Sequence, residues 1–170
     1  MISRSRLKEP FFTIWVICNE NRERSPIVAA VIKEYIPKDL RSYFEIESYG
    51  LDSTSDYVNV SIPGHIPNEI PEGIPIADLI LTMTEGQMKT VQDKFPFDHS
   101  GRQKVRMVVQ GQNLNTDGVG REAYVRFENR VTEHAYQILY LIISECVLKI
   151  QNTHPIDDTR RTKRKTGTQI

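Results

Sequence analysis

The chain has 170 residues, of which 39% are hydrophobic and 26% are charged, as in an ordinary soluble globular protein. This length suffices for one compact domain with a sizeable core. Lys plus Arg and Asp plus Glu both number 22, so no overall charge draws the chain to nucleic acid or to a membrane, and we expect neither partner.

Two cysteines, Cys18 and Cys146, are too few for a disulfide framework, which indicates a reducing compartment. We therefore predict a cytoplasmic protein. No segment approaches the roughly 18 to 20 apolar residues of a membrane span. The histidines show no metal-ligand spacing with the cysteines, so we predict no metal and no cofactor. They are His65, His99, His134 and His154.

The first half of the chain begins with a polar, basic lead-in over residues 1–10. Residues 11–17 are continuously apolar, which predicts a buried parallel strand. Residues 25–35 have a helical pattern, and Pro37 is expected to stop the helix. Residues 43–48 predict a second strand.

A long connection over residues 50–75 then carries four prolines, and loops of that length are usually functional. Residues 76–83 predict a third strand. A helix follows over residues 84–95, with Thr84 as its cap and Pro96 as its stop.

The last part of the chain contains a fourth strand over residues 104–109 and a polar loop over residues 110–120. One long helix is predicted from Arg121 to about Ile150, because apolar residues recur there at helical spacing. We assign that stripe to the core: Tyr124, Phe127, Val131, Ala135, Ile138, Ile142 and Cys146. Residues 153–170 have no apolar period and are predicted to be a disordered basic tail.

Alternating strands and helices predict an α/β fold, with a four-stranded parallel sheet between layers of helices. The domain is expected to span residues 11–152. Ligands of such folds bind at the carboxyl ends of the strands. Cys18, Ser48, Thr84 and the loop at residues 110–120 all follow strands at that edge.

The loop between the first strand and the first helix reads CNENRERSP, from Cys18 to Pro26. A thiol begins it and the guanidinium of Arg24 ends it. Loop N–H groups and a helix N-terminus bind a tetrahedral oxyanion, and an arginine grips two of its oxygens. The same field favours thiolate at Cys18, and thiolate is the nucleophile.

A lone cysteine after an apolar run is more often a buried small hydrophobe. The context favours an anion-binding loop instead. Ser25 is an N-cap type of residue and Pro26 suits a first helical turn. Asn19 and Asn21 stand where a tight loop needs a positive φ, which asparagine tolerates.

This loop resembles that of the low-molecular-weight protein tyrosine phosphatases, whose signature is Cys-x-Gly-Asn-x-Cys-Arg-Ser-Pro. The matches are Cys18, Asn21, Arg24, Ser25 and Pro26. Further segments match in the family's order and extend the resemblance over residues 11 to about 148: residues 47–50, 77–85, 95–96 and 117–120. The resemblance implies the strand order 2-1-3-4 of a flavodoxin-like fold.

The resemblance also implies a metal-independent phosphomonoester hydrolase of the tyrosine phosphatase type. Cys18 would form a cysteinyl-phosphate intermediate while Arg24 stabilises the phosphoryl oxygens. Asp117 stands at the family's acid position and would protonate the leaving group. A simple turn at Asp117-Gly118 is the alternative reading. Asp98 is the second choice for the acid.

The other site residues follow from the same match. Asn21, Ser25 and Ser48 are predicted to hold the loop, with Ser25 donating a hydrogen bond to the Cys18 thiolate. Arg22 and Tyr57 are predicted at the substrate rim. The phosphate-binding set is Asn19, Glu20, Asn21, Arg22, Glu23, Arg24 and Ser25. A phosphotyrosine protein or a small phosphomonoester is the expected substrate, and phosphate or another oxyanion the expected ligand.

Two departures from the family keep other functions open. Glu20 replaces the family's glycine and Glu23 its second cysteine, and like charge disfavours both thiolate and bound phosphate. A catalytically impaired phosphate-binding or protein-binding relative is therefore the alternative. Arsenate reduction uses a similar loop but needs further cysteines, and only Cys146 remains.

Overall fold

The computed structural model describes residues 10–52, 62, 64–73, 77–95, 104–118 and 120–153. Its elements follow in the order β1 Phe12–Cys18, α1 Arg24–Tyr35, the short 3-10 helix η2 Arg41–Tyr43, β2 Phe44–Gly50, β3 Leu79–Thr82, α2 Glu85–Lys94, β4 Val105–Met107, α3 Arg121–Glu133 and α4 Ala135–Thr153. Pro10 is all that is described of the predicted lead-in, and Thr153 all that is described of the predicted tail.

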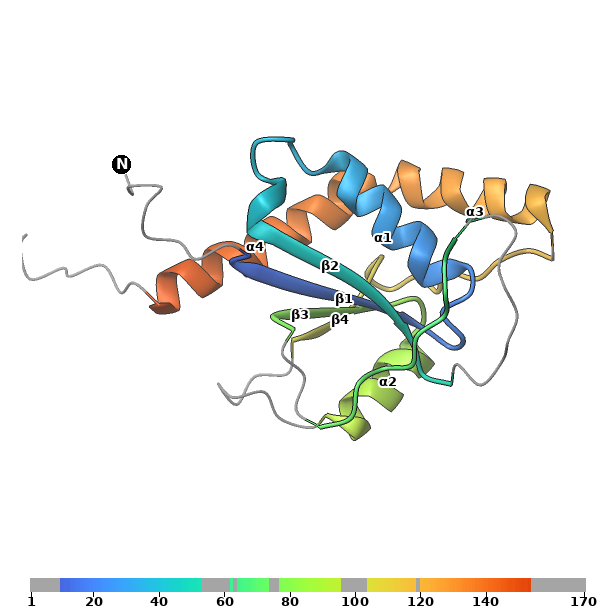
Figure 1. Ribbon diagram of the computed structural model, residues 1–170, viewed down its shortest axis with the longest axis horizontal. Helices are drawn as coiled ribbons and strands as arrows, with labels where there is room; N and C mark the ends of the chain where they lie inside the picture. The colour runs from blue at the N-terminus through green and yellow to red at the C-terminus, as the bar shows by residue number, and fades with distance from the viewer. Residues whose placement is uncertain are drawn as a thin grey trace, which may run out of the picture.

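The four strands form one parallel sheet in the order β2-β1-β3-β4, which confirms the predicted fold class and strand order. β1 lies in the interior of the sheet, between β2 and β3. Six of its seven residues are buried, as its continuously apolar sequence predicted. All four strands therefore end at the same edge, at the right of Figure 1.

Helices cover both faces of the sheet. α1, α3 and α4 lie on one face and α2 on the other (Figure 1). Alternate residues of β1 enter the two cores, as the period of a strand requires. Ile14 and Val16 pack with the α1, α3 and α4 side, whereas Trp15 and Ile17 pack with Val91 of α2.

The predicted single helix from Arg121 to Ile150 was wrong in one respect, because it is two helices. α3 ends before His134, whose φ of −96° and ψ of 4° depart from helical values, and α4 begins at Ala135. The predicted apolar stripe continues through this break, and its members up to Ile142 are buried. Cys146 is only partly buried. The helical spacing of the apolar residues did not reveal the break, since the stripe faces the core in both helices.

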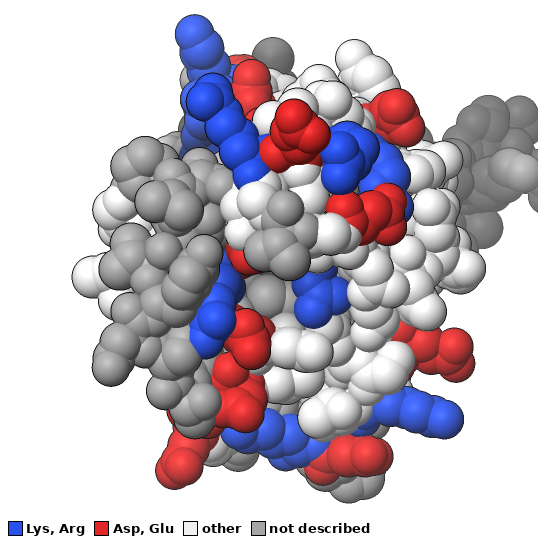
Figure 2. Space-filling view, turned by 90° about the vertical axis from the view of Figure 1, so that its right-hand side faces the viewer, with Lys and Arg blue, Asp and Glu red and all other residues white. Residues whose placement is uncertain are grey.

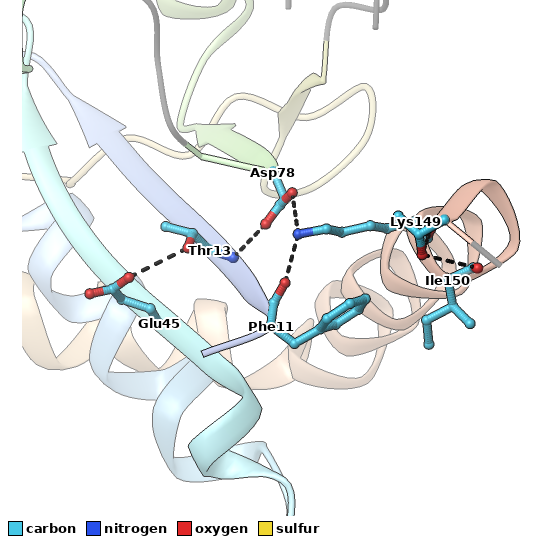
Figure 3. A network of polar contacts seen from close by, with 7 residues as sticks. Phe11, Thr13, Glu45, Asp78, Lys149 and Ile150 are labelled. Atoms are coloured by element: carbon cyan, nitrogen blue, oxygen red, sulfur yellow. Dashed lines mark hydrogen bonds and ion pairs between the residues drawn. The ribbon is translucent and has the colours of Figure 1, made fainter. Parts of the chain in front are cut away.

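An ion pair and hydrogen bonds connect the end of α4 to the amino ends of the strands (Figure 3). Lys149 Nζ lies 2.8 Å from Asp78 Oδ1 and donates to the carbonyl of Phe11 at 2.7 Å. Asp78 Oδ2 accepts a hydrogen bond from the backbone N–H of Thr13 at 2.9 Å. This network holds α4 across the sheet and leaves the opposite edge for the loop after Cys18.

Within the described residues, no helix is long and apolar enough to cross a membrane.

Candidate active site

The loop that follows β1 curls around the sulfur of Cys18. Cys18 is the last residue of β1 and is 3% exposed. The backbone N–H of Asn21 donates to its Sγ at 3.2 Å, and Ser25 Oγ lies 3.1 Å from the same sulfur. Both groups can donate to a thiolate, so the loop is arranged to stabilise negative charge on this sulfur.

Helix α1 begins one residue earlier than expected. It starts at Arg24, its N-cap is Glu23, and Glu23 makes no side-chain capping bond. Ser25 therefore lies in the first turn and is not the cap that the sequence pattern predicted. Its hydroxyl contacts Cys18 Sγ and, at 3.3 Å, the carbonyl of Tyr49. One hydroxyl proton serves both acceptors, so it can turn to the sulfur when the thiolate forms.

Asn21 sets the shape of the loop. Its φ is +53°, and it is fully buried. Its amide donates to the carbonyls of Ser48 and Asn68, the latter at 3.2 Å, while the hydroxyl of Ser48 donates back to Oδ1 at 3.2 Å. Ser48 thus contacts Asn21, as predicted. Asn19 has no positive φ, so that part of the expectation was wrong.

Two supporting residues were missed by sequence reasoning. His65 Nε2 lies 2.7 Å from the carbonyl oxygen of Asn21 and 3.0 Å from its Oδ1. Gln87 donates to Asn19 Oδ1 at 2.8 Å. A local signal existed for Gln87, because it stands three residues after the cap Thr84, as in a capping box. For His65, no sequence pattern indicated a place near the loop.

The guanidinium of Arg24 lies at the mouth of the loop. Its Nη1 donates to Asn115 Oδ1 at 3.0 Å, in the loop between β4 and α3. Asn115 was also missed. This contact orients Arg24 from the second polar loop, so two segments far apart in the sequence meet at the site.

The two unexpected carboxylates each have a partner. Glu20 forms an ion pair with Arg22, with 3.3 Å between Oε2 and Nη1. Glu23 accepts a hydrogen bond from the hydroxyl of Tyr124 in α3. These contacts offset part of the negative charge that Glu20 and Glu23 bring to the loop.

A hollow of about 300 Å³ opens above Cys18. It is lined by Cys18, Asn19, Glu20, Arg22, Glu23, Arg24 and Thr116. The structure thus brings six of the predicted site residues to one cavity. Figure 2 shows this end of the molecule, where basic and acidic side chains are interspersed.

Asp117 lies beside this hollow and does not line it. Its carboxylate is 70% exposed and sits 3.6 Å from Nη1 of Arg130. Its carbonyl accepts a hydrogen bond from Arg126 at 3.0 Å. Two arginines of α3 therefore fix the loop that carries Asp117, while the preceding residue, Thr116, reaches the hollow.

Other predicted residues lie elsewhere. Tyr57, predicted at the rim, and Asp98, the second choice for the acid, fall outside the described residues. Cys146 lies in α4 close to Lys149, near the amino end of β1, whereas Cys18 ends that strand. Burial raises the pKa of the Cys146 thiol. Among the described residues, no group of His, Cys, Asp and Glu could hold a metal ion.

Several solved structures share the fold of this chain. Wzb from Vibrio vulnificus in complex with benzylphosphonate is 19% identical, with a TM-score of 0.61 over 75% of this chain and 96% of that chain. The arginine phosphatase YwlE from Geobacillus stearothermophilus is 18% identical, with a TM-score of 0.60 over 84% and 97%. A low-molecular-weight protein tyrosine phosphatase from T. tengcongensis is 18% identical, with a TM-score of 0.59 over 81% and 99%.

The fold is that of the low-molecular-weight protein tyrosine phosphatases. The resemblance seen in the sequence motifs is thereby confirmed for the architecture that carries them. No family model matches the chain, and no curated protein matches it. The motif that begins at Cys18 thus lies on the scaffold of these structures, in a sequence that is 18–19% identical to them.

Proposed function

We propose that this protein is a metal-independent phosphomonoester hydrolase that acts through a cysteinyl-phosphate intermediate on phosphotyrosine proteins. The observation that carries the proposal is the placement of Cys18. Its sulfur lies at the base of a hollow, accepts a hydrogen bond from Asn21, and faces Ser25. A thiolate held by fixed donors at a cavity that can admit an oxyanion is what phosphoryl transfer to cysteine requires.

In the first step the Cys18 thiolate attacks phosphorus, a sulfur–phosphorus bond forms, and the phosphorus–oxygen bond to the leaving group breaks. Arg24 and the loop N–H groups bind the three remaining oxygens. Asp117 donates a proton to the departing oxygen. The exposed Asp117 carboxyl reaches the hollow by leaving its ion pair with Arg130, which is weak at such exposure.

In the second step water attacks phosphorus and breaks the sulfur–phosphorus bond. Asp117, now a carboxylate, accepts a proton from this water. The electron pair returns to Cys18, and the hydroxyl of Ser25 donates to the thiolate as it leaves. Inorganic phosphate is then released from Arg24 and the loop.

The proposal is tested by hydrolysis of p-nitrophenyl phosphate without added metal. Cys18→Ser is expected to abolish turnover, and Asp117→Asn to lower it about 100-fold. Cys146→Ser is the matched control, because this second thiol lies near the opposite edge of the sheet, and it should leave turnover unchanged. Arsenate reduction needs its own thiol-coupled arsenate assay, in which arsenate turnover that is lost with Cys146→Ser would point to a thiol relay.

The substrate class is tested with phosphotyrosine and phosphoarginine peptides of equal sequence context. The similar solved structures include one named an arginine phosphatase and one named a protein tyrosine phosphatase, so both peptides are needed. We expect preference for phosphotyrosine. A higher kcat/KM on phosphoarginine would overturn this part of the proposal while leaving the cysteine chemistry intact.

A second candidate is a phosphate-binding relative without turnover, and the carboxylates of Glu20 and Glu23 in the hollow favour it. Their contacts with Arg22 and Tyr124 argue the other way. Wild-type protein that binds phosphate, yet hydrolyses no phosphomonoester between about pH 5 and 8, would establish this candidate.

A further inference from the structure

The outer face of α4 is apolar. Five of the eight exposed large hydrophobic side chains in the described part of the molecule lie on this one helix: Tyr136, Tyr140, Ile143, Val147 and Leu148. The first four recur at helical spacing, so they form one stripe, which we call the α4 stripe together with Leu148. Tyr136 and Tyr140 are 79% and 77% exposed. Contiguous exposed apolar patches mark interaction sites.

No charged residue accompanies this stripe on α4. The helix has two charged residues, and each forms an ion pair with a residue in or next to the sheet. Lys149 pairs with Asp78 at 2.8 Å, and Glu145 pairs with Arg106 of β4 at 3.6 Å. Figure 3 shows Lys149 reaching from α4 toward the strand ends. The other exposed residues of α4 are polar but uncharged: Gln137, Gln151, Asn152 and Thr153.

The neighbouring helix α3 shows that this is not a general property of the surface. α3 packs on the same face of the sheet, and most of its exposed residues are charged: Arg121, Glu122, Arg126, Glu128 and Glu133. Its one exposed large hydrophobic residue is Val125. The change from a charged to an uncharged outer face occurs at the break between the two helices.

Basic sequence joins the molecule at the far end of the α4 stripe. Residues 1–9 and 154–170 hold eight of the 22 basic residues and three of the 22 acidic residues, which leaves 14 basic and 19 acidic residues in 10–153. The two segments continue from Pro10 and from Thr153, and close to both of these residues Lys149 contacts Phe11. The equal charge totals that led us to expect no membrane partner therefore conceal basic ends on an acidic body.

We propose that the α4 stripe docks on an anionic membrane surface, with the basic ends supplying the electrostatic attraction. Interfacial helices insert an apolar face among lipid headgroups, and tyrosines suit that zone because they are apolar with a polar tip. Basic clusters next to such a helix bind acidic lipids. The apolar stripe and the basic ends are both needed, since stable binding to a membrane surface requires two such features.

A lipid surface accounts for more of these features than a second copy of the chain does. A second copy would also cover the apolar stripe, but a face whose two most exposed side chains are tyrosines suits the headgroup zone of a lipid surface, where their polar tips meet water. Docking through α4 also leaves the hollow above Cys18 free, because the basic ends join at the amino ends of the strands and the hollow lies at the carboxyl ends (Figure 1). The inference does not depend on the proposed phosphatase activity.

The experiment is co-sedimentation of the full chain with vesicles of phosphatidylcholine alone or of an equimolar mixture with phosphatidylglycerol. We expect binding to the mixed vesicles only, falling as salt is raised. Tyr140→Gln combined with Ile143→Gln should weaken it about tenfold or more, since glutamine keeps the helix and removes the apolar contact. Replacing Arg160, Arg161, Lys163, Arg164 and Lys165 with glutamine should weaken it similarly.

Val125→Gln is the matched control, because it removes an exposed apolar side chain of α3, and it should leave binding unchanged. Circular dichroism checks that each variant is folded. No binding to the mixed vesicles overturns the proposal. So does binding that survives the α4 variant and is lost in the tail variant, which would place the contact in the tail alone. A concentration-dependent dimer in sedimentation without vesicle binding would assign the stripe to a second copy.

Discussion

The backbone of Asn21 decides which group faces the sulfur of Cys18. In a residue with φ of +53°, the N–H points back into the loop and donates to Sγ at 3.2 Å. Non-glycine residues adopt this conformation at a cost, and here the contacts with Ser48, Asn68 and His65 offset it. The family's glycine one position earlier is replaced by Glu20 without a positive φ, so the loop keeps its turn at Asn21 alone.

We expect Asn21→Ala to lower the free energy of unfolding by about 1–3 kcal/mol, because it loses the side-chain bonds and strains the left-handed backbone. Turnover should fall about tenfold or more, since the loop amides lose their fixed positions. Asn21→Gly separates the two causes, because glycine tolerates the positive φ. Urea unfolding and p-nitrophenyl phosphate kinetics measure both. Equal stability of the alanine and glycine variants would show that φ at this position carries no cost.

The hydrogen bond from Tyr124 to Glu23 weakens the repulsion that the Glu23 carboxylate exerts on an anion in the hollow. Tyr124→Phe removes the hydroxyl that binds the Glu23 carboxylate and leaves that charge free to repel an oxyanion. We expect the inhibition constant for phosphate to rise about three- to tenfold. Glu23→Gln in the same chain should restore it, because no carboxylate then remains at that position. Failure of this rescue would show that Tyr124 acts through packing.

At the scale of elements, β2 carries its charge on one face of an exposed edge. Glu45, Glu47 and Tyr49 alternate along the strand and so point to the same side of the sheet. Charged side chains on an edge strand discourage pairing with another chain. The hydroxyl of Tyr49 donates to Glu47 at 2.9 Å. Burial, followed by the contact with Glu47, raises the pKa of Tyr49 to about 12.

This raised pKa predicts a loss of stability in alkali. The folded protein holds the Tyr49 proton above pH 10, where the unfolded chain releases it, so folding stability should fall as the pH rises from about 10 to about 12. Tyr49→Phe should remove that part of the decline. Urea unfolding of both proteins at neutral and alkaline pH measures the difference. Parallel declines in the two proteins would contradict the shift.

At the scale of the whole molecule, the hollow and the contacts of α4 with the strands lie at opposite edges of the sheet. The carboxyl edge carries the hollow, Arg24 and the loop of Asn115. The amino edge carries the network of Lys149, Asp78 and Phe11, where both basic ends join. Since β1 runs from one edge to the other, the proposed chemistry and the proposed docking would use different surfaces.

Ending the chain after Thr153 should therefore leave kcat and KM for p-nitrophenyl phosphate within about a factor of two, because α4 ends at the edge of the sheet opposite to the hollow. The free energy of unfolding should also be unchanged within about 0.5 kcal/mol. Steady-state kinetics and urea unfolding of both lengths measure these values. A large loss of kcat in the shorter chain would place the tail at the carboxyl edge.

The sequence alone determined the strands, most helix bounds and the loop that begins at Cys18. These features are local, because an apolar run, a helical period and a nine-residue motif are each complete within one short segment. The strand order followed from resemblance and was confirmed. The break at His134 and the start of α1 at Arg24 were missed, since neither interrupts the apolar pattern.

Only the tertiary structure decided which side chains surround the loop. His65 contacts Asn21 across 44 positions of sequence, Gln87 contacts Asn19 across 68, and Asn115 contacts Arg24 across 91. Each is a contact of one pair of residues, through one hydrogen bond or, for His65, two, between segments that the sheet brings to one edge. A contact of that kind imposes no period and no spacing on the sequence, so it becomes visible only when the chain is folded.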